Sequence, residues 1–351
     1  MIVLCTHVSP SDEGGVASSA RFLLSKVPKD RSAIWVQVPV DKGDSYKIFP
    51  CVNQTTSVAF DKESELIDHL KVIDVVIVHF VTFASDFGLN LKRAKPHSKL
   101  VLNFRGNDAT LNVFKKEMRL EECIKSSELL VYVSSHLRNV IEARYDSAVG
   151  KGIVVNNSPK ESCAELIWPR QERLRERTKL KFGAIGFWKW KKGFSVLLEF
   201  LKNNPQYAKS FTIYGEIDER EPCLLSMYKS VEYELEITPL IPLAKNEVSN
   251  ALNDIDVLVI PSLAEGVPNV LLEGYSSGCF IIGSDIPGIS EIVARAKHGI
   301  TFKPGDSADL GRAIRVLESQ QTLLSSYLCD LSYVRESLYV DPWREISQAI
   351  S

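Results

Sequence analysis

The sequence predicts an α/β protein made of two domains, each built around a parallel sheet. Short apolar runs rich in Val, Ile and Leu alternate with amphipathic stretches along the whole chain, which is typical of buried parallel strands joined by helices. The 351 residues also exceed the ~250–300 at which one hydrophobic core usually stops growing. We expect a first domain over residues 1–160, completed by a helix over 340–351, and a second over residues 161–335.

The first series of strands is expected to be buried on both faces, because its apolar runs do not alternate with polar residues. These strands are Ile2–Thr6, Ile34–Val38, Val75–Phe80, Leu100–Phe104, Leu129–Val133 and Ile153–Val155. The helices expected between them lie near Val16–Ser25, Glu63–Val72, Val113–Ser126 and Ser135–Tyr145.

The same pattern restarts after residues 157–178, a segment whose arginines and lysines predict a solvated connector or a basic strip facing a membrane or an acceptor's phosphates. The expected strands are Phe182–Gly186, Phe211–Tyr214, Leu235–Thr238, Val257–Ile260, Phe280–Gly283 and Gly299–Phe302. The expected helices are Gly193–Asn203, Leu243–Leu252, Pro268–Ser277, Gly288–Ala296 and Asp306–Ser319. A last helix should begin at Pro342, capped by Asp341, and its Trp343 should pack on the first domain.

Composition excludes several classes of protein. The net charge of −2 gives no basic field for nucleic acid. The seven scattered cysteines, with no C-x-x-C spacing, argue against disulfides and zinc and fit a cytoplasmic protein. The opening MIVLCTHVSP indicates a strand rather than a signal peptide, and no apolar run approaches the ~20 residues of a membrane span.

The segment PSLAEGVPNVLLE is the first candidate site. It follows the strand Val257–Ile260, so Glu265 lies at the carboxyl end of a parallel strand, where α/β proteins bind ligands. The N–H groups of Gly266, Val267 and Asn269 are expected to face hydroxyls or phosphates near a helix start, and Pro268 pre-sets the helical angle.

Glu273 follows Glu265 by eight residues. On one helix this spacing gives about 80° beyond two full turns and a rise of ~12 Å, so the two carboxylates are predicted to hold opposite ends of one ligand rich in vicinal hydroxyls. The small residues after Glu273, such as Gly274, predict that something approaches closely there.

The stretch Pro261–Val293 resembles the signature of retaining GT-B glycosyltransferases of family 4. Weaker similarities lie at Gly14-Gly15, Val101–Gly106, Val154–Asn157, Lys192–Phe194 and Trp343. The resemblance implies two Rossmann-like domains facing a cleft, with a UDP- or GDP-sugar donor, no cofactor, and a saccharide or lipid-linked acceptor. It further implies that Glu265 contacts the donor sugar, that Glu273 holds the ribose, and that a lysine and an arginine bind the diphosphate.

Lys192 matches that lysine, but Phe187 stands at the arginine position. We expect Lys189 to replace the missing cation, because fixed cations stabilise the growing negative charge on the leaving group. The alternative for this loop, which also holds Trp188 and Trp190, is a lipid-facing surface.

Other site predictions are weaker. Arg105 is expected at the cleft or in a surface ion pair, Gly14 and Gly15 at the donor or in a plain turn, and Leu240 and Ile241 at the base. His79 is expected near the acceptor or as a buried strand-end histidine. Asp254-Ile255-Asp256 precedes a strand, so it lies at the wrong sheet edge for a metal site, and we expect no required metal.

The sequence therefore favours a metal-independent retaining glycosyltransferase of surface polysaccharide or glycolipid synthesis, cytoplasmic or at the inner face of the membrane, with a front-side mechanism. The alternatives are a nucleotide-sugar epimerase of similar fold and a binding-only relative, the latter because of Phe187. The sequence predicts no nucleic-acid partner and leaves the sugar, base, acceptor and oligomeric state open.

Overall fold

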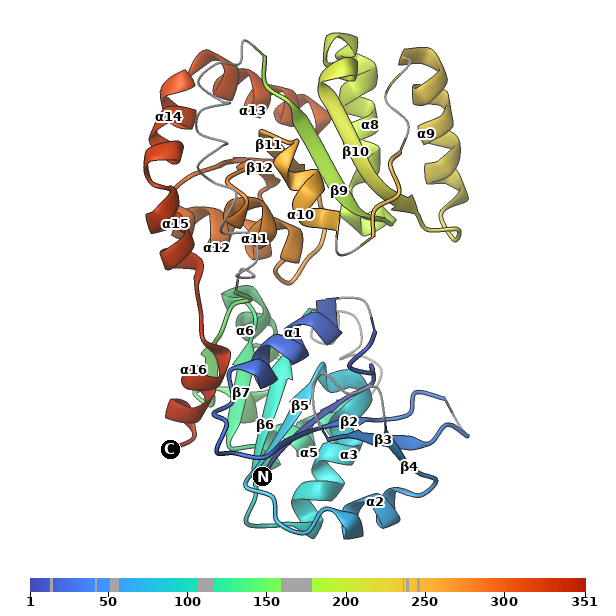
Figure 1. Cartoon of the computed structure of the whole chain (residues 1–351), viewed down its shortest axis with the longest axis vertical. Coiled ribbons are helices and arrows are strands. Elements are labelled where there is room, and N and C mark those ends of the chain that lie inside the picture. The colour runs from blue at the N-terminus through green and yellow to red at the C-terminus, as the bar shows by residue number, and fades with distance from the viewer. Residues whose placement is uncertain are drawn as a thin grey trace. The chain divides into compact units, whose positions relative to one another are not determined.

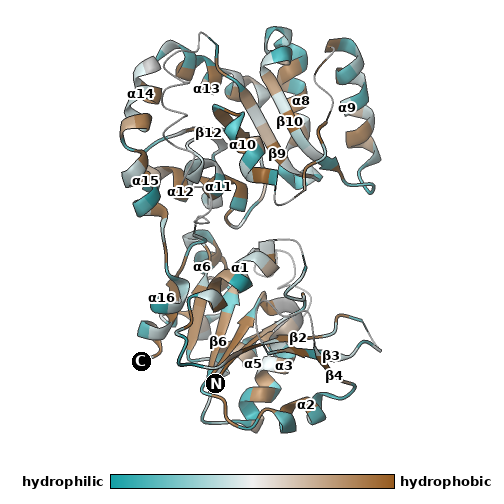
Figure 2. Cartoon of the chain, in the orientation of Figure 1, coloured by the Kyte–Doolittle hydropathy of each residue, from teal (hydrophilic) through white to brown (hydrophobic). Residues whose placement is uncertain are grey.

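The computed structural model describes residues 1–12, 15–41, 43–50, 57–106, 117–158, 179–235, 237, 240–244 and 247–351. The chain forms two compact units (Figure 1). Unit 1 comprises Met1–Asn157 and Val340–Ser351, and unit 2 comprises Ser158–Tyr339. In the described residues of both units, the strands are mostly hydrophobic and the helices contain both hydrophobic and hydrophilic residues (Figure 2), as expected of sheets covered by amphipathic helices.

Unit 1 holds, among its described residues, an eight-stranded sheet in the order β4-β3-β2-β1-β5-β6-β7-β8. Its strands are β1 Ile2–Thr6, β2 Ala33–Gln37, β3 Tyr46–Phe49, β4 Val58–Phe60, β5 Val75–His79, β6 Lys99–Phe104, β7 Leu129–Tyr132 and β8 Gly152–Val154. Its helices are α1 Gly15–Ser25, α2 Glu63–His69, α3 Val81–Ala94, α5 Glu117–Ser126, α6 Ser135–Glu142 and α16 Pro342–Ala349.

Helices cover both faces of this sheet. Val75 and Ile77 of β5 belong to the core that also contains residues of α1 and α16. Val78 points to the other face, where α3 crosses so closely that a Cβ on Gly88 would lie 2.3 Å from the Val78 side chain. The expected docking of the terminal helix is confirmed, since Trp343 is buried in the core of unit 1.

Unit 2 holds a five-stranded parallel sheet in the order β10-β9-β11-β12-β13 within its described residues. Its strands are β9 Phe182–Trp188, β10 Phe211–Ile217, β11 Val257–Ile260, β12 Phe280–Ser284 and β13 Ile300–Phe302. Its α-helices are α8 Phe194–Asn203, α9 Pro222–Leu235, α10 Val248–Asn253, α11 Asn269–Ser276, α12 Pro287–Ala296, α13 Ser307–Ser319, α14 Gln321–Cys329 and α15 Leu331–Leu338. Short 3-10 turns add η2 Asp146–Ala148 in unit 1, with η4 Trp190–Lys192 and η5 Pro205–Ser210 in unit 2.

Three expectations about elements were wrong. The first sheet is not entirely parallel, because β3 pairs antiparallel with both β2 and β4. The stretch 81–94, for which no helix was expected, forms α3. The strand expected at Leu235–Thr238 is not seen in its described residues, since Leu235 ends α9 and Ile237 is buried outside any strand; Glu236 and Thr238 lie outside the described residues. Pairing with β10 occurs instead at Ile241.

Candidate functional site

The candidate site lies at the carboxyl edge of the sheet in unit 2. Since β9, β10 and β11 are parallel, the loops that follow them meet at one edge of the sheet. These loops carry Lys189 and Lys192 after β9, Asp218 after β10, and Glu265 after β11.

The loop after β9 is anchored by Trp188. Its ring is buried, stacks on Phe194 at 4.5 Å, and its indole N–H donates to the carbonyl of Tyr214 at 3.2 Å. Trp188 therefore belongs to the core and not to a lipid-facing surface, whereas Phe187 and Trp190 are 50% and 60% exposed.

Lys189, Lys191 and Lys192 lie on a turn, residues 189–193, that we call the lysine turn. Gly193 ends it with a φ of +65°, and a Cβ there would lie 1.8 Å from the Pro261 carbonyl oxygen, so only glycine permits this approach to the loop after β11. The carbonyl of Lys191 accepts hydrogen bonds from Leu263 at 2.7 Å and from Ala264 at 3.3 Å. The lysine turn and the Glu265 loop are thus joined backbone to backbone.

Glu265 and Lys192 form an ion pair in the resulting corner. The Lys192 ammonium lies 2.5 Å from Glu265 Oε1, and the Glu265 side chain is only 11% exposed. Gly288 packs directly against this loop, because a Cβ added at this position would lie 1.7 Å from the Gly266 carbonyl oxygen. The structure thus brings together the two residues predicted to handle the sugar and the diphosphate.

The predicted helical relation between Glu265 and Glu273 was wrong. Helix α11 begins only at Asn269, after Pro268, so Glu265 lies in the preceding loop and helix geometry does not fix its distance from Glu273. Gly274 accommodates the sheet and not a ligand, because its Cβ would lie 2.6 Å from the Leu258 side chain. Glu273 itself is partly buried, as are Gly266 and Asn269, whereas Val267 and Pro268 are buried.

Lys189 pairs with Asp218, a residue that was not predicted from the sequence. The Lys189 ammonium lies 3.2 Å from Asp218 Oδ2 and 5.1 Å from the centre of the Phe187 ring. Arg220 donates two hydrogen bonds to the same carboxylate, from Nε to Oδ1 at 2.9 Å and from Nη2 to Oδ2 at 2.7 Å. The Arg220 hydrogen bonds, with help from Lys189, hold the pKa of Asp218 well below its usual range. Asp218 was missed because the expected strand ended at Tyr214, whereas β10 continues to Ile217, the residue directly before Asp218.

Glu221 was also missed. Its carboxylate accepts a hydrogen bond from the backbone N–H of Trp190 at 3.0 Å, so the loop after β10 also holds the lysine turn.

Leu240 and Ile241, which were predicted to bind the base, have backbone groups that already form hydrogen bonds within unit 2. Ile241 donates to the carbonyl of Ile213 at 3.0 Å and accepts from Gly215 at 2.8 Å. Leu240 donates its N–H to the Tyr228 hydroxyl at 2.9 Å. A contact to a base from these residues would have to use the Leu240 carbonyl or the side chains of Leu240 and Ile241, of which Ile241 is 38% exposed.

The predicted residues of unit 1 lie at the carboxyl edge of its own sheet. His79 is 1% exposed; Asn103 donates to its Nδ1 at 3.1 Å, which leaves Nε2 to donate to the Ser19 hydroxyl at 2.8 Å. Burial, and then the nearby Arg105, lower the pKa of His79 well below its usual value. This geometry fits the buried strand-end alternative for His79 better than an acceptor-binding role.

Arg105 donates to the side-chain oxygen of Asn157. Gly15 is exposed at the start of α1, whereas Gly14 and residues 170–178 of the basic strip lie outside the described residues. Within the described parts of the chain, no three His, Cys, Asp or Glu side chains gather as a metal site would require. Among the helices that the structure describes, none combines the length and apolarity needed to cross a bilayer.

Residues 179–320, which contain the lysine turn and both glutamates, match the family model described as Glycosyl transferases group 1. We call residues 179–320, the segment that this model matches, the group 1 domain. The whole chain has the GT-B fold: it superposes on sucrose-phosphate synthase from Thermosynechococcus elongatus with a TM-score of 0.72 and 15% identity, covering 99% of this chain and 96% of that one. For Anabaena HepE in complex with UDP-glucose the TM-score is 0.74 at 14% identity, covering 99% and 98%.

A curated relative of this chain is the N,N'-diacetylbacillosaminyl-diphospho-undecaprenol alpha-1,3-N-acetylgalactosaminyltransferase of Campylobacter jejuni. It is 28% identical over 134 residues, which is 38% of this chain and 34% of that protein. The matched region thus spans about a third of the length of that relative.

Proposed function

We propose that the protein is a glycosyltransferase that moves a sugar from a nucleotide-sugar donor to a saccharide or lipid-linked acceptor. The observation that carries this proposal is the Lys192–Glu265 ion pair at the carboxyl edge of the group 1 domain. A carboxylate accepts hydrogen bonds from sugar hydroxyls, while an adjacent ammonium suits a diphosphate.

In this proposal Lys192 stabilises the diphosphate as the glycosidic bond breaks and its negative charge grows. Glu265 positions the donor sugar, and Glu273 holds the ribose. The donor phosphate takes the proton of the attacking hydroxyl from the same face, so the anomeric configuration is retained. No metal is required, and the protein's main contributions are position and fixed charge.

The donor is a UDP- or GDP-sugar, which the complex of HepE with UDP-glucose supports. The acceptor belongs to surface polysaccharide or glycolipid synthesis, and unit 1 is assigned to binding it. The name of the Campylobacter jejuni relative, which contains a diphospho-undecaprenol, supports a lipid-linked acceptor and work at the inner face of the membrane.

The test is a panel of UDP-, GDP- and ADP-sugars incubated with saccharide and undecaprenyl-diphosphate-linked acceptors, with and without a chelator. We expect nucleoside diphosphate release coupled to an enlarged acceptor, with the donor's anomeric configuration in the product by NMR. Nucleotide release without acceptor change, or no release from any donor, would contradict transfer.

The exposed ring of Phe187, at the position where the family resemblance implies an arginine, favours a second candidate. This candidate is a protein that binds nucleotide sugar without turning it over. Tight donor binding by calorimetry together with no product in the panel would select it.

A further inference from the structure

The three ammonium groups of the lysine turn differ in what they face. Lys189 pairs with Asp218 at 3.2 Å, and Lys192 pairs with Glu265 at 2.5 Å. Within the part of the chain that the structure describes, Lys191 has no carboxylate within ion-pair distance and no hydrogen-bond acceptor for its ammonium. Lys191 is therefore the cation of this turn that can meet an incoming anion without breaking an existing pair.

Lys189 is a poorer candidate than the sequence suggested. The side chain of its partner Asp218 is only 6% exposed, so withdrawing Lys189 would leave this carboxylate to Arg220 alone. Breaking a pair that involves a buried charge costs more than moving an unpaired ammonium.

The main chain of Lys191 is fixed against the loop that carries Glu265. Its carbonyl holds the N–H groups of Leu263 and Ala264, the two residues that precede Glu265. The position of Lys191 is therefore set by the same loop that carries the sugar-binding carboxylate.

The surroundings of Lys191 also favour an anion. Burial, and then the positive charges of Lys192 and Lys189, lower its pKa, while Glu265 acts in the opposite direction. An ammonium that has already lost part of its water, beside other cations, gains more from a phosphate than a fully hydrated one.

We propose that Lys191 binds the phosphate groups of the donor and supplies the second cation that Phe187 cannot. The inference rests on the proposed function, because it names the residue that would hold the donor's diphosphate. The ligand class is a diphosphate, whether inorganic or part of a nucleotide.

The experiment is isothermal titration of the full chain with inorganic pyrophosphate and with UDP, GDP, ADP and their free nucleosides. Lys191→Met is expected to weaken pyrophosphate and the preferred nucleoside diphosphate by about tenfold or more, which is the loss of a charge-assisted hydrogen bond. Affinity for the free nucleoside should stay the same. Lys191→Arg should restore most of the diphosphate affinity, because the charge is kept.

Lys202→Met is the matched control, since it removes a lysine at the opposite end of α8 that pairs with Glu234. It should change neither affinity. Circular dichroism melts verify that each variant is folded.

Wild-type affinity for pyrophosphate in Lys191→Met would overturn the inference. A larger loss of pyrophosphate affinity in Lys189→Met than in Lys191→Met would also overturn it, because it would assign phosphate binding to Lys189. Pyrophosphate binding that depends on Lys191 in a protein that transfers no sugar would support the inference and refute the proposed function. A wild-type protein that binds neither pyrophosphate nor any nucleoside diphosphate would overturn both.

Discussion

At the scale of single residues, the Lys192–Glu265 pair combines two tasks. Glu265 loses most of its hydration on folding, and Lys192 supplies the opposite charge at 2.5 Å. In the proposed reaction the same ammonium must also serve a leaving group whose negative charge increases. Its loss should therefore be felt more in the transition state than in the ground state.

For Lys192→Met we accordingly expect kcat to fall by about 100-fold or more, while donor affinity changes by less than about tenfold. Steady-state kinetics with the preferred nucleotide sugar, together with donor titration, would separate the two effects. A melting curve would report how far the unpaired Glu265 destabilises unit 2. Normal turnover in this variant would remove Lys192 from the mechanism.

Glu273 tests the nucleotide end of the proposed site. Glu273→Ala should weaken nucleoside diphosphate binding by about 1–3 kcal/mol, because it removes a charged hydrogen-bond acceptor for the ribose hydroxyls. Glu336→Ala, an exposed change on α15, provides a control without expected effect. Equal affinities in wild type and Glu273→Ala, measured by calorimetry, would refute the ribose role.

At the scale of elements, the buried strands were predictable because their apolar runs are continuous. β1 and β11, for example, have the bounds that the sequence indicated. Helix α3 was not predictable, because no side chain caps it and Phe80, the residue before it, adopts a left-handed φ of 66°. Gly88 within it lowers helix propensity, but the close crossing over Val78 requires it.

The candidate site was predictable in part for a similar reason. The motif around Glu265 marked a strand end, and strand ends of a parallel sheet share an edge. The partners Asp218 and Glu221 both lie in the loop after β10, distant in sequence from the lysine turn, so only the folded chain shows that they hold this turn. The start of α11 was expected within one residue, at Pro268, but the helical spacing from Glu265 to Glu273 was wrong, because Glu265 lies before that start.

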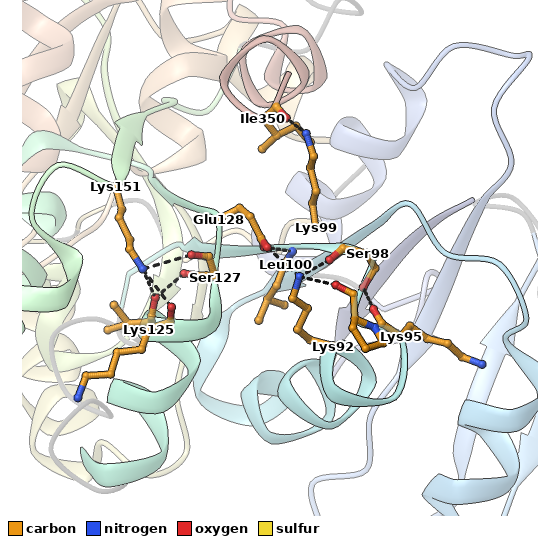
Figure 3. Close-up of polar contacts among 12 residues, drawn as sticks. Lys92, Lys95, Ser98, Lys99, Leu100, Lys125, Ser127, Glu128, Lys151 and Ile350 are labelled. Atoms are coloured by element: carbon orange, nitrogen blue, oxygen red, sulfur yellow. Dashed lines mark hydrogen bonds and ion pairs between the residues drawn. The ribbon is translucent and has the colours of Figure 1, made fainter.

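The end of helix α5 offers a test of an element's stability. Lys151 donates to the carbonyls of Ile124 at 3.0 Å, Lys125 at 3.2 Å and Ser127 at 3.3 Å (Figure 3). An ammonium placed there satisfies carbonyls that lack helical partners and interacts favourably with the helix dipole.

Lys151→Met should therefore lower the free energy of unfolding by about 1–2 kcal/mol, measured by urea denaturation. Lys125→Met, which removes only an exposed pair with Glu121, should cost no more than about 0.5 kcal/mol. Equal losses in the two variants would show that the carbonyl contacts contribute nothing beyond a surface charge.

At the scale of the whole molecule, the chain leaves unit 1 after Asn157 and returns to it at Val340. The returning helix α16 contributes Trp343 and Ile346 to the core of unit 1, together with residues of α1 and β1. Unit 1 is thus completed by Val340–Ser351, which follow unit 2 in the sequence, whereas unit 2 is continuous in sequence. A substitution that disturbs α16 should consequently destabilise unit 1 and not the part of unit 2 that precedes α16 in the sequence.

Ile346→Ala tests this consequence, because it removes a fully buried side chain and should cost about 2–4 kcal/mol. Hydrogen exchange followed by mass spectrometry should show faster exchange in β1 and β5, while β11 and β12 keep their protection. Gln348→Ala, an exposed change on the same helix, should leave both patterns as in the wild type. Each unit has its own sheet, so we expect the two units to unfold separately. Equal loss of protection in both units would instead mean that they unfold as one cooperative body.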